Sequence, residues 1–373
     1  MAEYSYPDEM NQLILIIFGL FLSHGTGACL SRGEVGNDTV NDGPHIFQVK
    51  DKLKAEWIQN NVFMEAFIGP ENFSKFSRKF NLAFSYDDLN HAFHLRPNHE
   101  QRHKKADSIA VISDIHGNYP VYTDLLKVSG IIDENLNWNF GKGHLVVLGD
   151  MFDRGDMVTE VLWHLFGLEI QAEKAGGKVH VLLGNHEFMV LQNDLCYANP
   201  KYARYASYSN KDYAEYFSVK TVLGNWLRSK PVIITIDDIM FVHGGISDEM
   251  VQRKMDVRKI NWIFTEKIIG KKLYKINESE PFRLLCGNHG PLWYRGYFHD
   301  PGFCENSIDS ILDFYGMKHI VVGHTPNVTI NSLFDNKILG ADTGICDGRS
   351  GEILIYKDGN FYQSLSTGRR NKL

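Results

Sequence analysis

The chain has 373 residues, of which 43% are hydrophobic, 12% aromatic and 23% charged. These proportions are ordinary for a globular protein and exclude a disordered, collagen-like or coiled-coil chain. The formal net charge of −6 argues against a protein that grips nucleic acid mainly through its phosphates. The five cysteines lie far apart with no CxxC pair, so neither a disulfide framework nor a structural zinc site is indicated.

The N-terminal segment is typical of an export signal. An apolar run from Leu13 to Leu22 is too short to span a bilayer but suits the hydrophobic part of a signal, and small residues follow up to Cys29. These residues resemble a lipoprotein cleavage box, which would lipidate Cys29 and tether the chain to a membrane. We therefore expect residues 1–43 to be an export signal and linker, and the protein to be periplasmic or membrane-anchored. The alternative is a buried N-terminal segment of a cytoplasmic protein, and translation could start at Met1 or at Met10.

Residues 44–106 carry no recognisable chemistry, and we interpret them as an accessory segment packed on the main domain. The apolar spacing from Lys52 to Phe67 predicts a helix there. From residue 107 to 373, short apolar runs alternate with amphipathic stretches, which predicts an α/β domain with a β-rich end. Buried strands are expected at Ile109–Ile112, Leu145–Leu148, Val179–Leu183, Val232–Ile236, Met240–Val242 and Ile320–Val322. Helices are expected at 119–129, 156–175, 213–228 and 307–316.

A polar cluster follows five of these strands. Because the carboxyl ends of neighbouring strands converge on one edge of a sheet, we expect the clusters to lie together. Each motif alone is weak, since an isolated histidine near a strand end is more often structural, but five in fixed order indicate one site. The clusters are SDIHG with Asp114 and His116, GDMFDRG with Asp150, Asp153 and Arg154, GNHE with Asn185, His186 and Glu187, HGGI with His243, and GHT with His324.

The residue types in these clusters indicate metal binding. Aspartate, histidine and asparagine ligands without thiolates favour manganese, iron or zinc over copper(I) or an iron–sulfur centre. The candidate ligands are two aspartates, three histidines and one asparagine. Six ligands are too many for one tetrahedral zinc ion but suit two ions that share a carboxylate. Two divalent ions with two aspartates leave a positive surplus that would neutralise a phosphate dianion, and they could activate a bridging water for in-line attack.

The motifs SDIHG, GDMFDRG, GNHE, HGG and GHT, in this order, resemble those of the calcineurin-like metallophosphoesterases of the phosphoprotein phosphatase branch. The stretch from Gly149 to Tyr202 is similar to the Shewanella-like protein phosphatases, and the resemblance covers about residues 107 to 350. One departure is Ser113, where the wider branch usually has glycine. The resemblance implies a metallophosphoesterase fold, in which a central β-sandwich is flanked by helices in four αββα layers, and two divalent metal ions, with manganese the first expectation.

The resemblance also implies roles for single residues. Asp114, His116 and the bridging Asp150 would hold one ion, and Asp150, Asn185, His243 and His324 the other. His186 would donate a proton to the leaving oxygen while Asp153 keeps its imidazole protonated, although Asp153 could instead be a turn residue. Glu187 is expected to brace the site rather than to bind metal.

Two arginines and one amide are expected to bind the substrate phosphate. Arg154 follows the bridging aspartate by four residues and could hold phosphate oxygens bidentately. Arg295, in GPLWYRGY, resembles the second phosphate-binding arginine of the family, and its alternative is a surface arginine stacked on Trp293 or Tyr294. Asn185 would contact phosphate as well as metal.

The resulting prediction is a metal-dependent phosphomonoester hydrolase. A protein phosphatase acting on phosphoserine, phosphothreonine or phosphotyrosine through a metal-activated water is the first expectation, with a small phosphomonoester also open as substrate and no nucleic acid partner. A dinucleoside polyphosphate hydrolase is the alternative, because those enzymes share the metal signature. A catalytically inactive metal-binding scaffold is the second alternative, against which the complete set of acid, arginine and ligand residues argues.

Overall fold

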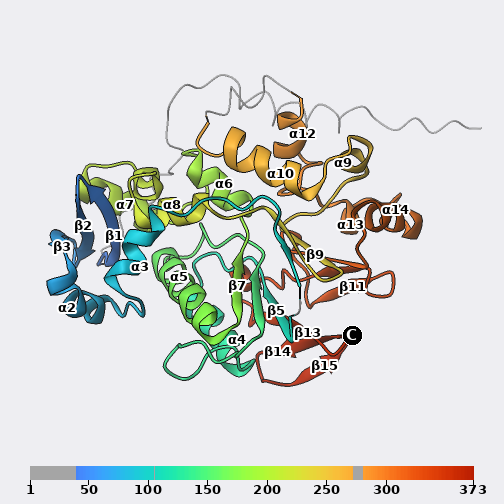
Figure 1. Cartoon of the computed structure of the whole chain (residues 1–373), viewed down its shortest axis with the longest axis horizontal. Helices are drawn as coiled ribbons and strands as arrows, with labels where there is room; N and C mark the ends of the chain where they lie inside the picture. Colours follow the sequence, from blue (N-terminus) through green and yellow to red (C-terminus); the bar gives the residue numbers. More distant parts are fainter. Residues whose placement is uncertain (1–38, 105, 272–279) are drawn as a thin grey trace, which may run out of the picture.

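A computed structural model describes residues 39–104, 106–271 and 280–373 (Figure 1). The apolar run from Leu13 to Leu22 and the lipidation site at Cys29 lie outside these residues, so export and membrane tethering stay predictions. Within the described residues, no helix combines the length and the apolar character needed to cross a membrane.

The first described elements form a three-stranded antiparallel sheet, here called the accessory sheet, at one side of the molecule (Figure 1). Its strands are β1 (Asp42–Val49), β2 (Lys52–Gln59) and β3 (Val62–Ile68). The helix predicted from Lys52 to Phe67 is therefore wrong. Buried Leu53, Ala55 and Trp57 alternate with polar residues at the two-residue period of a strand, and left-handed residues at 60 and 61 turn the chain into β3.

Two six-stranded sheets form the centre of the molecule. The first has the order β15-β14-β13-β5-β6-β7 and the second β11-β12-β10-β9-β8-β4. In the first sheet, the parallel strands are β5 (Ser108–Ile112), β6 (His144–Val147) and β7 (Lys178–Val181), and the antiparallel strands are β13 (Glu352–Lys357), β14 (Asn360–Leu365) and β15 (Arg370–Lys372). The second sheet comprises β4 (Arg102–His103), β8 (Ile233–Ile236), β9 (Ile239–Val242), β10 (His319–Val322), β11 (Asn331–Leu333) and β12 (Ile338–Gly340).

Side-chain alternation packs these two sheets face to face. On β5, Ile109 and Val111 join a core with Phe241 of β9 and Val321 of β10, whereas Ala110 belongs to the core beneath the helices. Both faces of the central strands are thus buried, which explains why they appear as continuous apolar runs. The expected β-sandwich flanked by helices is confirmed.

Helices cover the outer faces of the sandwich (Figure 1). The helices α4 (Tyr119–Val128) and α5 (Val158–Ala175) pack on the first sheet, and α10 (Val257–Ile263) contacts β8 of the second. The helix predicted at 213–228 is interrupted, because extended residues at 218 and 221 separate a 3₁₀ turn (Tyr213–Phe217) from α8 (Val222–Arg228). The other helices are α2 (Pro70–Phe80), α3 (Tyr86–Ala92), α6 (Asn185–Leu191), α7 (Pro200–Ser209), α9 (Asp248–Gln252), α12 (Phe282–Cys286), α13 (Gly296–His299) and α14 (Glu305–Tyr315), with a π-turn at Phe264–Ile268 and a 3₁₀ turn at Ile345–Asp347.

The accessory sheet packs on the rest of the molecule through β1, which contacts α5 and α8. Phe47 of β1 forms a bridge with Thr221, next to α8. Because β1 begins at Asp42, it crosses the predicted boundary between residues 43 and 44. The domain boundaries themselves stay predictions.

Candidate metal centre

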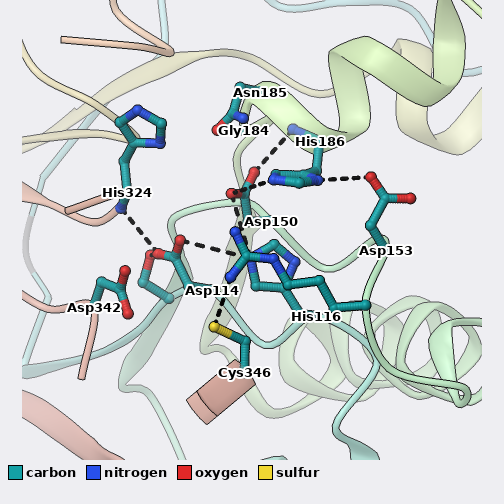
Figure 2. Close-up of polar contacts among 12 residues, drawn as sticks. Asp114, His116, Asp150, Asp153, Gly184, Asn185, His186, His324, Asp342 and Cys346 are labelled. Atoms are coloured by element: carbon teal, nitrogen blue, oxygen red, sulfur yellow. Dashed lines mark hydrogen bonds and ion pairs between the residues drawn. The ribbon is translucent and has the colours of Figure 1, made fainter. Parts of the chain in front are cut away.

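The five polar clusters lie together where strands β5, β6, β7, β9 and β10 end, as Figure 2 shows for most of their residues. Strands β5, β6 and β7 run parallel in one sheet, and β9 and β10 run parallel in the other, so their carboxyl ends open on the same edge of the sandwich. Two glycines allow the backbone to pass close to the aspartates of these clusters. A Cβ on Gly184 would lie 2.2 Å from Asp150 Oδ1, and one on Gly323 would lie 2.7 Å from Asp114 Oδ2.

Asp150 occupies the middle of the cluster. Its Oδ2 lies 3.3 Å from His243 Nε2, 3.7 Å from His116 Nε2 and 3.8 Å from His186 Nε2. The last two distances are too long for hydrogen bonds but suit ligands that share an ion. One carboxylate therefore faces imidazoles from three strand ends.

Two groups of side chains could each hold a metal ion among the described residues. Asp150 and His116 belong to the first, together with His186, and Asp150, His243 and His324 form the second. This set of ligand atoms fits divalent ions, because His324 Nε2 is buried with no hydrogen-bond partner in the described part of the chain. His243 Nε2 also lies 2.8 Å from Asn185 Oδ1, so amide and carboxylate oxygens converge beside an imidazole nitrogen.

Backbone carbonyls orient two of the histidines. His116 Nδ1 lies 2.6 Å from the Phe152 carbonyl, and His243 Nδ1 lies 3.0 Å from the Leu148 carbonyl. When Nδ1 carries the proton that these bonds require, Nε2 is left to face the centre as a ligand. Asp114 is held similarly, since its Oδ2 accepts hydrogen bonds from Ser113 Oγ at 2.5 Å and from the His324 amide at 3.0 Å. Serine at position 113 thus supports a ligand.

The pKa values of the buried acidic and histidine side chains are shifted in the way expected of a cation site. Burial alone would raise the pKa of Asp150, but the imidazoles of His243 and His186 outweigh burial and hold it well below its usual range. Burial and then the carboxylate of Asp342 raise the pKa of Asp114. Burial would lower the pKa of His243, yet the Asp150 carboxylate raises it to about 9. In the absence of metal, protons on His243 and Asp114 therefore compensate the negative charge that bound metal ions would otherwise compensate.

The predicted acid pair is in direct contact. His186 Nδ1 lies 2.6 Å from Asp153 Oδ2, and both side chains are buried. Burial disfavours the imidazolium, but the carboxylates of Asp150 and Asp153 raise the pKa of His186 above its usual value. This contact favours the paired arrangement over the alternative of Asp153 as a simple turn residue.

Glu187 braces the loop that carries Asp150. Its carboxylate accepts hydrogen bonds from the amides of Gly184 and Asp150 through Oε2, at 2.7 and 2.8 Å, and from that of Met151 through Oε1, at 2.7 Å. Every one of these bonds is buried. Both carboxylate oxygens of Glu187 therefore already accept hydrogen bonds from the backbone, as expected for a residue that positions ligands.

The two candidate phosphate arginines come from different loops, and the carboxylates of Asp114 and Asp150 act on both. Arg154 Nη1 lies 2.8 Å from Cys346 Sγ, and the Arg154 carbonyl accepts from Asn199 Nδ2 at 2.8 Å. Arg295 precedes α13 and is half-buried. Burial lowers the pKa of its guanidinium, while the carboxylates of Asp114 and Asp342 act in the opposite direction.

Two residues of the centre escaped the sequence analysis. Asp342 lies beside Asp114 and His324 (Figure 2), and its Oδ1 accepts from the Gly344 amide at 3.0 Å. It follows the apolar strand β12 in the stretch ADTG, so it repeats the pattern that revealed the other clusters. Cys346 contacts Arg154 from the same loop, and nothing in its local sequence signals that contact.

Comparisons with known proteins place this arrangement in a family. Residues 108–328 match the family described as calcineurin-like phosphoesterase. A crystal structure of a cold-active protein-tyrosine phosphatase from a psychrophilic Shewanella species superposes with a TM-score of 0.82, at 34% identity, over 90% of this chain and 100% of that one. Shewanella-like protein phosphatase 1 of Plasmodium berghei is 30% identical over 64% of this chain and 67% of its own length. A symmetrical bis(5'-nucleosyl)-tetraphosphatase of Buchnera aphidicola is 30% identical over only 45% of this chain and 54% of its own.

Proposed function

Because the chain belongs to the calcineurin-like phosphoesterase family, we propose that it is a metal-dependent protein phosphatase that hydrolyses phosphotyrosine and phosphoserine or phosphothreonine. The observation that supports this most directly is the single carboxylate of Asp150 facing histidines from three strand ends. The protein-tyrosine phosphatase from Shewanella covers almost the whole chain, whereas the tetraphosphatase covers less than half. That difference favours a phosphoprotein over a dinucleoside substrate.

The family implies divalent metal ions, and the residues present fit them. Asp114, His116 and Asp150 would hold one ion, and Asp150, Asn185, His243 and His324 the other. When bound, two such ions would offset the charge of the phosphate and acidify a water molecule for attack on phosphorus. We propose manganese as the resident metal, because the ligands are carboxylate, amide and imidazole without thiolate.

The remaining residues bind the phosphate and move a proton. Arg154 and Arg295 carry guanidinium groups on different loops around the centre, and they would hold the phosphate oxygens from two directions, aided by the Asn185 amide. His186 would donate its Nε2 proton to the leaving oxygen, since its Nδ1 is bonded to Asp153. Asp153 keeps the imidazolium charged and fixes its plane.

A substrate panel tests the proposal. The purified protein, loaded with manganese, would be assayed on phosphotyrosine peptides, phosphoserine peptides and diadenosine tetraphosphate, with a chelator-treated sample as the control. We expect hydrolysis of the peptides that the chelator abolishes and manganese restores, at a kcat/KM above that for the dinucleotide. A higher kcat/KM for diadenosine tetraphosphate would reject the protein phosphatase assignment in favour of the dinucleoside alternative.

We also propose export of the chain, on the strength of the apolar run at 13–22 and the small residues before Cys29. Mass spectrometry of the natively expressed protein would identify its first residue and any acyl group on Cys29. We expect a mature chain that begins near Cys29. A chain that retains Met1 or Met10 would reject export without affecting the chemistry.

A further inference from the structure

Tyr197 is an exposed aromatic residue beside the acid pair. Its ring centroid lies 5.3 Å from that of His186, with the two ring planes at 61°. Among the large apolar side chains that are exposed in the described part of the chain, Tyr197, at 55% exposure, is the one whose ring contacts a residue of the centre. The other ring beside His186 belongs to His116, at 4.6 Å, and that residue is buried. The proposed acid therefore has a buried neighbour at His116 and an exposed neighbour at Tyr197.

Hydrogen bonds hold Tyr197 against the loop that carries Asp153 and Arg154. The Arg154 amide donates to the Tyr197 carbonyl at 3.0 Å, and Asn199 Nδ2 donates to the Arg154 carbonyl at 2.8 Å. The segment that carries Tyr197 is thus fixed to the loop of a candidate phosphate arginine. A ring on a segment fixed in this way contacts a ligand at a smaller cost in conformational entropy than a ring on a free loop.

The direction of proton transfer places the leaving group near this ring. His186 Nδ1 is bonded to Asp153 (Figure 2), so Nε2, which lies 3.8 Å from Asp150 Oδ2, is the atom that would reach the leaving oxygen. Proton transfer needs that oxygen within about 3.2 Å of Nε2, so the atoms attached to it would lie beside the imidazole. Because the imidazole is buried where it contacts His116, the leaving group would extend toward its exposed neighbour, Tyr197.

The candidate leaving groups differ in what they offer to the Tyr197 ring. Phosphotyrosine carries an aromatic ring directly on the leaving oxygen, whereas phosphoserine and phosphothreonine carry a saturated carbon that leads at once to the peptide backbone. Aromatic rings attract each other in edge-to-face or offset arrangements with centroids about 4.5–7 Å apart. A tyrosine leaving group could therefore pair with the Tyr197 ring, and a serine or threonine leaving group could not.

We propose that Tyr197 is a specificity-determining residue, whose exposed ring packs on the phenol ring of phosphotyrosine and favours this substrate over phosphoserine. The inference rests on the proposed phosphatase function, with His186 as the proton donor. A ring pair of this kind changes affinity by about two- to tenfold. Tyr197 would contact the leaving group and not the phosphate, for which the arginines and the metal ions are the proposed partners.

Two peptides of one sequence, one with phosphotyrosine and the other with phosphoserine, test the proposal on the manganese-loaded full chain. Tyr197→Ala should lower kcat/KM for the phosphotyrosine peptide about fivefold, mainly through KM, and change that for the phosphoserine peptide by less than about twofold. Tyr197→Phe should behave like the wild type, because it keeps the ring. Tyr208→Ala, exposed on α7, is the matched control and should alter neither value. Circular dichroism confirms that each variant is folded.

The pattern of losses separates a contact with the substrate from support of His186. Hydrolysis of phosphoserine depends more on the acid than hydrolysis of phosphotyrosine, because an alkoxide is the poorer leaving group. If Tyr197 only positioned His186, its removal would therefore slow hydrolysis of the phosphoserine peptide more. A larger loss on the phosphoserine peptide, or equal losses on both peptides, would overturn the proposal.

Two phosphonates that cannot be hydrolysed test the contact without turnover. Isothermal titration of the manganese-loaded wild type should give a Kd for phenylphosphonate about fivefold below that for methylphosphonate, and Tyr197→Ala should bring the two within about twofold. A preference for phenylphosphonate that survives Tyr197→Ala, or no binding of either compound, would contradict the inference. If the wild type shows this preference but hydrolyses neither peptide, the proposed function fails and the contact of Tyr197 with an aryl ligand stands.

Discussion

At the scale of single residues, the candidate metal centre is built on strained backbone. Left-handed conformations cost a residue other than glycine about 1 kcal/mol each, and they persist where the surroundings fix them. Here backbone bonds do so, since the His116 amide donates to the Asp150 carbonyl at 2.9 Å and the Gly155 amide to the His116 carbonyl at 2.9 Å. The strained residues are Asp114 (φ 54°), His116 (47°), Asp150 (55°), Asp153 (69°), Arg154 (61°) and His324 (62°).

The central position of Asp150 leads to the first prediction. Asp150→Asn keeps the size of the side chain but removes the charge that faces three imidazoles, so both metal ions should bind far more weakly. We expect metal content well below that of the wild type after dialysis, measured by inductively coupled plasma mass spectrometry, and a loss of turnover of at least about 100-fold. Asp124→Asn, exposed on α4, is the control. Full occupancy of both sites with normal turnover would refute the ligand assignment.

The contact between His186 and Asp153 leads to a prediction graded by leaving group. A serine alkoxide needs a proton as it departs, whereas the phenolate of p-nitrophenyl phosphate needs little help. His186→Gln should therefore slow phosphoserine hydrolysis by about 10²-fold and hydrolysis of p-nitrophenyl phosphate by less than about tenfold. Steady-state kcat on both substrates, with metal content measured in parallel, provides the comparison. Equal losses on the two substrates would assign His186 to structure instead of proton transfer.

Most residues of the centre could be predicted because each cluster directly follows an apolar strand. The ligands and the acid pair lie where their motifs placed them, and their metal and acid roles stay predictions until they are tested. Asp342 could have been found by the same rule, since it follows β12. The contact of Arg154 with Cys346 could not, because it joins residues 192 positions apart in the chain and depends on the tertiary fold.

At the scale of secondary-structure elements, the strands whose two faces are both buried were predicted correctly. The strands β5, β6, β9 and β10 are short apolar runs bounded by glycine and polar residues, and the structure confirms each. The strands of the accessory sheet were predicted wrongly, because Glu56 is buried although it is acidic, with Lys54 and Lys211 as its partners at 2.7 and 2.8 Å. Such tertiary ion pairs blur the alternation of polar and apolar residues that identifies a strand.

Glu187 of α6 holds the loop that follows β6, and this role leads to a prediction about stability. Glu187→Gln would replace an acceptor oxygen by an amide that points its own hydrogens toward backbone donors. The free energy of unfolding should fall by about 3 kcal/mol, because charge-assisted bonds are lost in a buried place. Urea denaturation of the metal-free protein measures this change, and Glu134→Gln, in an exposed turn, should leave it unaltered. An unchanged midpoint for Glu187→Gln would show that the loop holds without its brace.

At the scale of the whole molecule, one buried aspartate joins the accessory sheet to the rest of the protein. Asp42 of β1 lies 2.8 Å from Lys201 Nζ of α7, and its Oδ2 accepts from Thr159 Oγ1 of α5 at 3.1 Å. Lys201 Nζ also donates to the Asp156 carbonyl at 2.5 Å, three residues beyond Asp153. Through Asp42 and Lys201, the accessory sheet is thus connected to the loop that carries Asp153 and Arg154.

This connection leads to the prediction that Asp42→Asn destabilises the whole fold at neutral pH. The substitution leaves Lys201 buried without its carboxylate, and the free energy of unfolding should fall by about 3 kcal/mol, as measured by urea denaturation. Asp51→Asn, in the exposed turn after β1, is the matched control and should cost little. The double variant Asp42→Asn with Lys201→Met should recover part of the loss, because it removes both charges.

The pH dependence of this loss separates the ion pair from simple packing. Burial would raise the pKa of Asp42, but His45 and Lys201 outweigh burial and lower it below its usual value. A carboxyl with a lowered pKa stabilises the folded state above its unfolded pKa of about 4 and loses that contribution as the pH falls further. The difference in unfolding free energy between wild type and Asp42→Asn should therefore shrink below about pH 4. A difference that persists unchanged at low pH would show that Asp42 holds the accessory sheet by shape and neutral hydrogen bonds, and not by its charge.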